Sequence, residues 1–335
     1  MSDGTELLKA VYADPENDGP RLVYSDWLLE RDDRLGEFIA LQIARKTKGK
    51  RTQSKEKALF AAEGDRWWRD HPSTKFHSFR YEDTDRGFPA RFRPGWPVSD
   101  EHLLAQEREV VALVDSPGWS TVRELFLQFD LQSKGVADLL RRADLRSLEK
   151  LHDLNVAILD RIADLSLPVR YLELWVRSDR DLPKVTGLQS VDELIVDMRA
   201  GVARVMKALS PSRFVERVRS LELRGVASMV LDEALGVYAD LPASLETFAL
   251  NQFYGQTVTL SGARERPKLA VSLTAHQIEL VIGELANLRA DAVESLSVTF
   301  AEGGYFTKKN RPLLAAQMQQ ALARFGARAT LDSGK

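Results

Sequence analysis

An apolar-x-x-apolar-x-apolar pattern recurs from the middle of the chain to its C-terminal part. In the first copy, Val122–Leu127, the last two apolar positions are separated by a single residue, which is the period of a strand with one buried face. Strands this short cannot bury their apolar residues alone, so neighbouring copies have to stack on one another. The further copies are Leu151–Val156, Val169–Leu174, Val191–Val196, Val218–Leu223, Leu245–Leu250 and Val293–Val298.

The spacing of these copies predicts an α/β fold, a leucine-rich-repeat-like solenoid over residues 121–331. Successive copies start 29, 18, 22, 27, 27 and 48 residues apart, which brackets the leucine-rich repeat period of roughly 20–29 residues if the last step holds two units. Segments with helical spacing lie between the copies, so parallel strands are expected inside and helices outside. Seven or eight strands are expected, with Val258–Leu260 and Leu269–Leu273 forming a hairpin across Gly262.

The repeats depart from the usual leucine-rich pattern, and a second α/β fold has to be weighed against the solenoid. Other residues replace the asparagine or cysteine that usually follows the last leucine of such repeats, so the repeats are degenerate and have no asparagine ladder. A doubly wound α/β sheet would also alternate strands and helices, but its strands would read as continuous apolar runs. No glycine-rich nucleotide-binding sequence is present either. The solenoid is therefore the preferred prediction.

The first 70 residues predict a helical module in front of the repeats. Apolar residues at helical spacing occur over residues 5–13, from about 20 to 28, from about 35 to 43, and over 55–70. Residues 71–120 then predict a linker and an N-terminal cap of the solenoid, because the end of a repeat array has to be closed. The elements expected there are short strands around Phe76–Tyr81 and Ala90–Phe92 and a helix from about Asp100 to Val114.

The module also carries a motif. Residues 18–31 read Asp-Gly-Pro-Arg-Leu-Val-Tyr-Ser-Asp-Trp-Leu-Leu-Glu-Arg, and residues 36–42 read Gly-Glu-Phe-Ile-Ala-Leu-Gln. This sequence resembles the bacterial repeat-companion domain family, a short N-terminal module found in front of leucine-rich-type repeats. The resemblance is close over residues 5–45 and extends more weakly to Trp67 or Trp68 and to Arg86–Ala90. It implies an architecture, a companion module followed by repeats, and it carries no catalytic residues over to this chain.

Composition sets broad limits on partners and location. The 335 residues are 44% apolar and 29% charged, and the net charge of −2 provides no global field toward nucleic acid or an anionic membrane. The absence of cysteine excludes disulfides, thiolate metal ligands and a cysteine nucleophile. The acidic N-terminus shows no secretory signal, and no apolar run approaches the ~20 residues that cross a bilayer. A cytoplasmic location is expected.

Residues able to carry chemistry are sparse, so the chain is expected not to be an enzyme. None of the five histidines is spaced like a helical metal site, and neither a metal nor another cofactor is expected. No G-x-S-x-G elbow is present. An enzyme of unrecognised type, with His71 and His77 in its pocket, is the remaining alternative. A catalytic alternative would use the polar residues crowded in the module, Arg21, Tyr24, Asp26, Glu30 and Glu37. The preferred interpretation is that Arg21 and Asp26 tie helices together, while Tyr24 and Trp27 bury their rings.

A basic run follows the third predicted helix. It is typical of a solvated helix end and loop, since basic side chains are favoured near a helix C-terminus. The alternative is a binding site for nucleic acid or an anionic surface, although no aromatic residue interleaves the run to stack on bases. Its cationic residues are Arg45, Lys46, Lys48, Lys50, Arg51, Lys55 and Lys57.

The concave face of the solenoid is the preferred binding surface. Side chains that flank the last two apolar positions of each strand are expected to point into it, unless Phe126 and Trp175 pack under a neighbouring loop. Aromatic and arginine anchors among polar groups are typical of protein interfaces. The expected function is therefore a non-enzymatic scaffold or adaptor that binds another protein. The predicted partner-binding residues are Phe126, Gln128, Asn155, Glu173, Trp175, Ile195, Asp197, Glu222, Arg224, Asn251 and Thr299.

Overall fold

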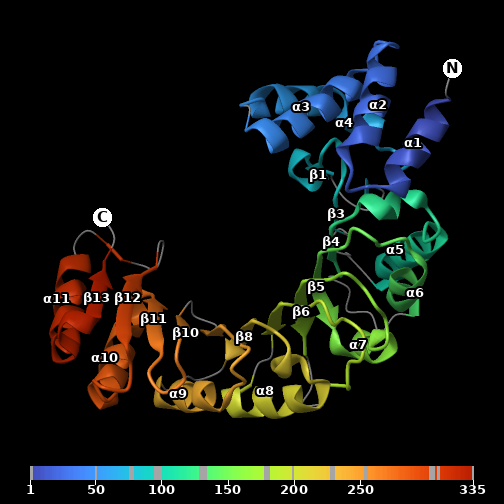
Figure 1. Cartoon of the computed structure of the whole chain (residues 1–335). Helices are drawn as coiled ribbons and strands as arrows, with labels where there is room; N and C mark the ends of the chain where they lie inside the picture. Colours follow the sequence, from blue (N-terminus) through green and yellow to red (C-terminus); the bar gives the residue numbers. More distant parts are fainter. Residues whose placement is uncertain are drawn as a thin grey trace. The chain divides into compact units, whose positions relative to one another are not determined.

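Helices and strands alternate along the chain in a computed structural model, which shows a mixed α/β protein (Figure 1). Among the described residues, eleven strands form one mostly parallel sheet, in the order β13-β12-β11-β10-β9-β8-β7-β6-β5-β4-β3. The predicted α/β class is confirmed at this level. The structure describes residues 3–49, 51–74, 79–93, 100–127, 134–176, 182–197, 200–226, 231–252, 256–301, 306–307 and 310–333.

The chain divides into two compact units, each described by itself below. Unit 1 comprises Met1–Leu172 with Thr186–Ser190, and unit 2 comprises Glu173–Val185 with Val191–Lys335. The N-terminal helices, the segment that follows them and the first strands of the sheet thus share one unit. The boundary between the two units lies inside strand β6 (Tyr171–Trp175).

Unit 1 begins with four helices that match the predicted ones closely. Asp3, Asn17 and Asp33 cap the first three, each accepting a hydrogen bond from a backbone N–H two residues on. The third ends at Gly49, whose φ of 60° suits a glycine C-cap. The helices are α1 (Gly4–Ala13), α2 (Asp18–Leu29), α3 (Arg34–Lys48) and α4 (Gln53–Trp67).

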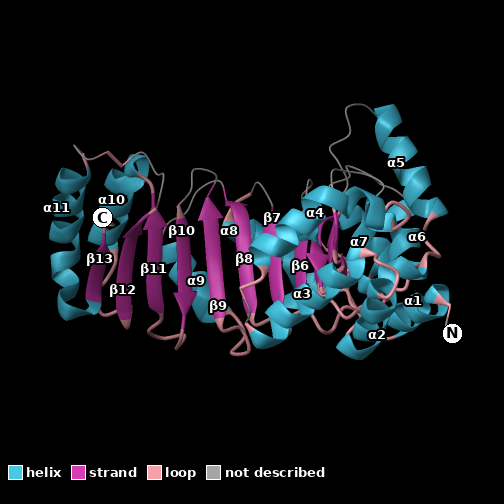
Figure 2. Ribbon diagram, turned by 90° about the horizontal axis from the view of Figure 1, so that it is seen from above, coloured by secondary structure: helices cyan, strands magenta, loops and turns pink. Residues whose placement is uncertain are grey.

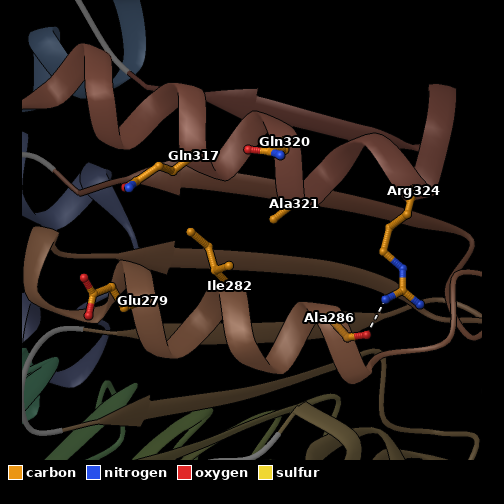
Figure 3. A pocket seen from close by; sticks show the side chains of 7 residues that line it. All are labelled: Glu279, Ile282, Ala286, Gln317, Gln320, Ala321 and Arg324. Carbon is orange, nitrogen blue, oxygen red and sulfur yellow. Dashed lines mark hydrogen bonds between the residues drawn. The ribbon is translucent and has the colours of Figure 1, made fainter.

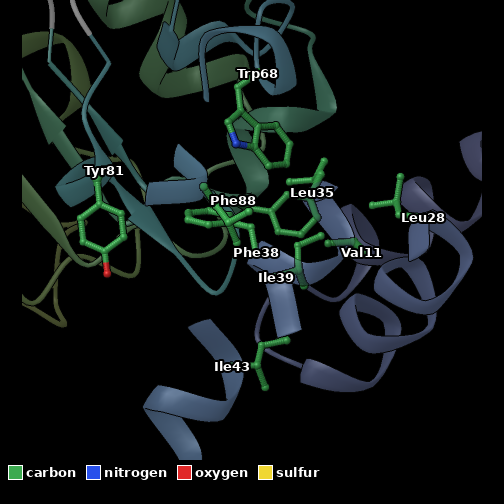
Figure 4. Close-up of a cluster of buried hydrophobic side chains, with 10 residues drawn as sticks. Val11, Leu28, Leu35, Phe38, Ile39, Ile43, Trp68, Tyr81 and Phe88 are labelled. Atoms are coloured by element: carbon green, nitrogen blue, oxygen red, sulfur yellow. The ribbon is translucent and has the colours of Figure 1, made fainter. Parts of the chain in front are cut away.

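The helical module has a hydrophobic core that combines its helices with residues beyond them (Figure 4). Phe38 and Ile39 of α3 are fully buried, and Phe88 from the later hairpin is fully buried with them. The Trp68 and Phe88 rings have centroids 5.0 Å apart. The module therefore needs the segment around Phe88 to complete its core. The core residues are Val11, Leu28, Leu35, Phe38, Ile39, Ile43, Leu59, Trp68, Tyr81 and Phe88.

A tight hairpin joins the core to α3. Strands β1 (Thr84–Asp85) and β2 (Phe88–Pro89) pair antiparallel across Arg86 and Gly87, which have φ of 50° and 82°, as in the two-residue turns of hairpins. The buried Gln42 side chain accepts a hydrogen bond from Gly87 N at 2.6 Å and donates one to Thr84 Oγ1 at 2.8 Å. Two separate parts of the sequence motif, the Leu-Gln of α3 and the Arg-Gly-Phe turn, therefore contact each other.

The first strands of the sheet follow the module in unit 1. Strand β3 pairs parallel with β4, Arg91 opposite Glu124, so the predicted capping strand at Ala90–Phe92 is present. Of the other predicted strand, around Phe76–Tyr81, residues 76–78 lie outside the described residues. The described remainder is not a strand, and Tyr81 begins a short 3-10 helix. The elements are η1 (Pro72–Thr74), η2 (Tyr81–Asp83), β3 (Arg91–Phe92), α5 (Asp100–Ala112), η3 (Pro117–Thr121), β4 (Glu124–Phe126), α6 (Lys134–Arg142), β5 (Lys150–Asn155), α7 (Val156–Ile162) and β6 (Tyr171–Trp175).

The register of β5 corrects one repeat boundary. Leu125 of β4 pairs with Leu151, and Phe126 pairs with His152. The residue equivalent to Val122 is therefore Leu148 rather than Leu151. The pattern was misplaced because Asp153 has a φ of 56° and kinks the strand, so that Leu154 and Asn155 are both buried in succession. A kink of this kind breaks the two-residue alternation on which the prediction depended.

His71 is buried where the module meets the first strands of unit 1. Its Nε2 lies 3.0 Å from Gly118 O and 3.4 Å from Thr121 Oγ1. Burial lowers the pKa of His71 to about 3, although the Gly118 carbonyl acts in the opposite direction. The ring is therefore neutral in the folded chain at neutral pH, with its Nε2–H donated to the Gly118 carbonyl.

Acid is expected to destabilise unit 1 through His71. The unfolded chain takes up a proton on this residue below about pH 6.5, whereas the folded chain does not until about pH 3, so stability falls as the pH falls between these values. The matching variant is His71→Gln, which keeps an N–H donor. Between pH 7 and pH 5, we expect the unfolding free energy of the wild type to fall by about 2 kcal/mol more than that of the variant. Urea unfolding at both pH values measures this difference. Equal losses in the variant and the wild type would contradict it.

Unit 2 continues the alternation of strands and helices, with one reversed strand. Strand β10 pairs antiparallel with both β9 and β11, whereas β11 pairs parallel with β12. The predicted hairpin across Gly262 is thus confirmed, with its second strand in a repeat position. Strand β13 was not predicted, and the strand count exceeds seven or eight. The elements are β7 (Glu193–Asp197), α8 (Val202–Leu209), η4 (Ser210–Ser212), η5 (Phe214–Glu216), β8 (Ser220–Val226), α9 (Leu231–Asp240), β9 (Thr247–Gln252), β10 (Thr257–Ser261), β11 (Lys268–Leu273), η6 (Ala275–Gln277), α10 (Ile278–Asn287), β12 (Ser295–Phe300), α11 (Arg311–Leu322), η7 (Ala323–Arg328) and β13 (Ala329–Asp332).

The two faces of the sheet in unit 2 differ in cover. Helices α8, α9 and α10 lie on one face (Figures 1 and 2). Alternate residues along the strands are buried, and Leu221 and Leu223 are fully buried examples. The residues between them, such as Glu222, are half-buried or exposed. We call the second set the open face. In strands β8, β9, β11 and β12 it consists of Ser220, Glu222, Arg224, Thr247, Ala249, Asn251, Lys268, Ala270, Ser272, Ser295, Ser297 and Thr299.

Candidate functional site

The open face of unit 2 is ordered in rows that run across the strands. Glu222 of β8 lies opposite Ile195 of β7 and Ala249 of β9. The next row places Arg224 opposite Asp197 and Asn251. Side chains at matching positions of adjacent strands lie close enough to interact, so each row forms a continuous strip of surface.

Arg224 is the centre of a charged cluster on this face. Its Nε donates to Glu222 Oε1 at 2.7 Å, and its Nη1 donates to Glu173 Oε1 at 2.5 Å. The Arg224 side chain is 35% exposed, and the two carboxylates are more buried than the guanidinium. A guanidinium held by two acceptors is fixed in orientation. The three charges together leave a net charge of −1.

Three further predicted residues lie on the strands next to this cluster. Trp175 follows Glu173 by two residues on β6, so both occupy the same face of the strand, and Trp175 is half-buried. Asp197, opposite Arg224, is also half-buried. Ile195 is 6% exposed, so it contributes to the interior of the face more than to its accessible surface.

Beyond β8 the open face consists mostly of small side chains. Asn251 of β9 is half-buried, and Thr299 of β12 is exposed, as predicted for partner-facing positions. The sequence pattern did not single out the positions between them, which are mostly serine, threonine and alanine. Such residues give a flat surface with hydroxyl groups, beside the charged and aromatic part on β6–β8. These positions are Thr257, Thr259 and Ser261 of β10 with Lys268, Ala270 and Ser272 of β11.

Phe126 belongs to unit 1, where its ring has intramolecular partners. It stacks on His152 with ring centroids 4.1 Å apart and an interplanar angle of 4°, and the Arg93 guanidinium lies 4.3 Å from its ring centre. Tyr171 extends the row, 4.7 Å from His152. Sequence reasoning missed His152 because the repeat boundary was misplaced. Reading the residue opposite Phe126 in the corrected register identifies it.

Asn155 requires a correction. It was predicted to point into the binding face, but it is buried, and its Oδ1 accepts a hydrogen bond from Ala157 N at 2.9 Å. It is the N-cap of α7, because the alternation of burial along β5 breaks at Asp153, whose φ is 56°. Gln128 lies outside the described residues.

Most of the described basic run is paired with carboxylates of the same module. Arg45 Nε contacts the buried Glu56 at 3.0 Å, and Lys46 Nζ contacts Asp85 at 3.0 Å. Lys55 lies 2.5 Å from Glu37, and Lys57 lies 3.5 Å from Glu82. These pairs reduce the positive potential that a phosphate would meet, which weighs against the anion-binding alternative. Of the other predicted residues, Lys48 and Arg51 are exposed, and Lys50 is outside the described residues.

A second charged cluster connects the module to the first strands within unit 1. The largely buried Arg86 side chain contacts Glu16, Asp18 and Asp85 at 3.2, 3.3 and 3.2 Å. Arg123, just before β4, contacts Asp85 at 3.3 Å and also pairs with Glu16. Burial raises the pKa of Asp85, but Lys46, Arg86 and Arg123 outweigh it and hold the pKa below its usual range.

A small polar cavity of about 240 Å³ lies beside this cluster. Its three basic residues, Lys46, Arg91 and Arg123, are all paired with its acidic ones, as in the Arg91–Glu124 contact at 2.9 Å. The charges of the cavity balance, so its contacts serve to hold the module on the strands. The lining residues are Lys46, Glu82, Thr84, Asp85, Ala90, Arg91, Arg123 and Glu124.

The polar residues of the module motif have structural contacts. Arg21 is 2% exposed, donates to the Pro15 carbonyl, and lies 5.1 Å from the centre of the Phe88 ring. Burial lowers the pKa of Arg21 to about 10. Tyr24 stacks on Trp27 with ring centroids 6.1 Å apart. These contacts support the interpretation that the polar motif residues tie helices together.

In the ranges that the structure describes, no group of three or more histidine, aspartate and glutamate side chains is arranged to hold a metal ion. None of the helices in the same ranges is long and apolar enough to cross a membrane.

Comparisons with known proteins identify no relative. A scan against protein-family models, a search of curated proteins and a search of solved structures each returned no match. Functional inference therefore depends on the geometry of the chain itself.

Proposed function

We propose that this chain is a non-enzymatic interaction scaffold whose open face binds another protein. In this proposal its strand and helix pairs are units of a degenerate leucine-rich-repeat-like solenoid. The observation that carries the proposal is the open face itself: side chains in register across strands β8 to β12 are half-buried or exposed, while the opposite face is covered by helices. A wide uncovered sheet face suits a macromolecular surface better than a small molecule, which needs a concave pocket.

The part of the open face on β6–β8 is the proposed centre of binding. Trp175 supplies aromatic area, and Arg224 supplies a guanidinium that Glu173 and Glu222 already orient. Tryptophan and arginine are enriched among the residues that dominate binding energy at protein interfaces. A preoriented guanidinium also loses less conformational entropy on binding. The small residues beyond β8 would provide a flat extension of the contact area.

The N-terminal module has a separate role in this proposal. We propose that it is a repeat-companion module, in agreement with the motif over residues 18–42. Its contacts with the first strands, in particular those of Arg86 and Arg123 with Glu16, support a capping role in unit 1. A cap covers the apolar edge that the first strand of a repeat array leaves open.

Alanine at Trp175 or at Arg224 is expected to weaken recovery of a native partner by roughly tenfold or more, because each substitution removes a central anchor. Affinity capture with the full-length chain, followed by quantitative mass spectrometry, compares each variant with the wild type. Both side chains are partly exposed, so we expect the melting temperature to fall by only a few degrees.

The matched control is Arg219→Ala. Arg219 is 68% exposed and pairs with Glu246 at 3.7 Å just before β8, so this variant removes the same charge without touching the open face. Partner recovery with Arg219→Ala should equal that of the wild type. The proposal fails if a partner is recovered equally well by the Trp175 and Arg224 variants.

A further inference from the structure

A groove runs between α10 and α11 in unit 2 (Figure 3). It has a volume of about 460 Å³, and its middle is apolar, with Ile282 on α10 facing Ala321 on α11, while Ala286 lies toward the Arg324 end. Leu313 lies one helical turn before Gln317 and is 63% exposed, so it extends the apolar surface along the same side of α11. The lining residues are Glu279, Ile282, Ala286, Gln317, Gln320, Ala321 and Arg324.

The outer surface of α11 is unusual in carrying no charge. The chain as a whole is 29% charged, yet every exposed residue within this helix is neutral. Exposed surfaces of soluble proteins are normally rich in charged side chains, and their depletion distinguishes the buried centre of a protein interface. This helix surface is therefore suited to being covered. Its exposed residues are Pro312, Leu313, Ala316, Gln317, Gln319 and Gln320.

Two charges of opposite sign mark the two ends of the groove. Glu279 stands near the start of α10, and Arg324 stands beyond the end of α11 (Figure 3). Arg324 donates to the Ala286 carbonyl and, at 2.8 Å, to the Leu288 carbonyl. A guanidinium has five N–H groups, so it retains donors for another carboxylate. The Glu279 end and the Arg324 end of the groove would exchange places under a two-fold rotation about its middle.

We propose that the groove is the interface with a second copy of this chain. Two copies related by a two-fold axis bring the same surface into contact twice. Each Glu279 then meets Arg324 of the other copy, while Leu313 and the apolar middle of the groove are covered. The opposite charges at the two ends make the surface complementary to itself. They set an antiparallel orientation, since a parallel one would bring like charges together. The proposal is independent of the function proposed for the open face.

Sedimentation analysis of the full-length chain over a concentration series tests the proposal. The wild type is expected to form dimers at micromolar concentrations. Glu279→Lys or Arg324→Glu alone is expected to raise the dimer dissociation constant about tenfold or more, because each places like charges opposite each other twice. An equimolar mixture of the two single variants is expected to recover dimers. Both contacts in the mixed dimer again join opposite charges.

Two further variants separate dimer contacts from folding. Arg324 also caps α10, so Leu313→Asp provides a change at an exposed position that leaves this cap intact, and we expect it to yield monomers. Glu233→Lys on the exposed side of α9 is the charge-matched control and should dimerise like the wild type. A wild type that stays monomeric up to on the order of 100 µM overturns the proposal. Dimers that are unaffected by Leu313→Asp, or single variants that fail to recover dimers on mixing, also overturn it.

Discussion

Replacing Gly87 with alanine is expected to lower the unfolding free energy of unit 1 by about 3 kcal/mol. Gly87 has a φ of 82°, a region that residues with a side chain rarely adopt. A Cβ at this position would lie 2.3 Å from Ile39 Cγ1 and 2.7 Å from Ile39 Cα. The hairpin would have to move away from α3, which would break the hydrogen bond from Gly87 N to Gln42. Urea unfolding followed by circular dichroism measures the loss.

Gly49→Ala is the control that separates the two causes. Gly49 also has a positive φ, 60°, but a Cβ there would meet no atom within 4 Å. We expect a loss of about 1 kcal/mol from backbone strain alone. Equal effects of the two substitutions would show that the close approach to Ile39 contributes nothing.

Replacing Glu56 with alanine is expected to destabilise unit 1 by about 2–3 kcal/mol. This carboxylate is fully buried and accepts hydrogen bonds from Tyr81 Oη at 2.6 Å, Thr52 Oγ1 at 2.5 Å and Arg45 Nε at 3.0 Å. Its removal leaves a buried hydroxyl and a partly exposed guanidinium without their acceptor. Because Arg45 can turn to solvent, the effect should lie below that of breaking a fully buried ion pair.

Glu82→Ala is the matched control for Glu56. The Glu82 side chain is 58% exposed and pairs with Lys57 at 3.5 Å, and such surface pairs contribute about 0–1 kcal/mol. Thermal unfolding should therefore separate the two variants clearly. If both leave the midpoint unchanged, Glu56 does not hold α4 and the Tyr81 segment together.

The strands were predictable because their signal is local. An apolar pattern of period two marks a strand with one buried face, and each of the seven copies falls on a strand of the structure. The hairpin of β10 and β11 followed from two such runs separated by Gly262. The helices were predictable for the same reason, since their apolar spacing and caps lie within a few residues of one another.

The register and the polar contacts were not predictable because they depend on distant residues. A positive φ at Asp153 is not visible in the sequence, yet it moves Asn155 from the expected binding face to a helix cap. Glu56 is the single acidic residue within the basic run, and its burial beside Arg45 appears only when α3 and α4 pack together. The contact of Gln42 with Gly87 spans 45 residues. On the open face, Glu173 and Trp175 could be placed by alternation, but the Glu173–Arg224 contact requires the packed strands.

The reversed strand β10 changes how much chain entropy the sheet of unit 2 costs to assemble. Parallel neighbours need a crossover connection of about a dozen residues or more, and closing a longer loop loses more entropy. Strand β10 meets β11 through residues 262–267 alone and pairs with the preceding β9 on its other side. These three strands make contacts that are local along the chain. The middle of unit 2 is therefore the part of its sheet that can pair with the smallest entropic cost.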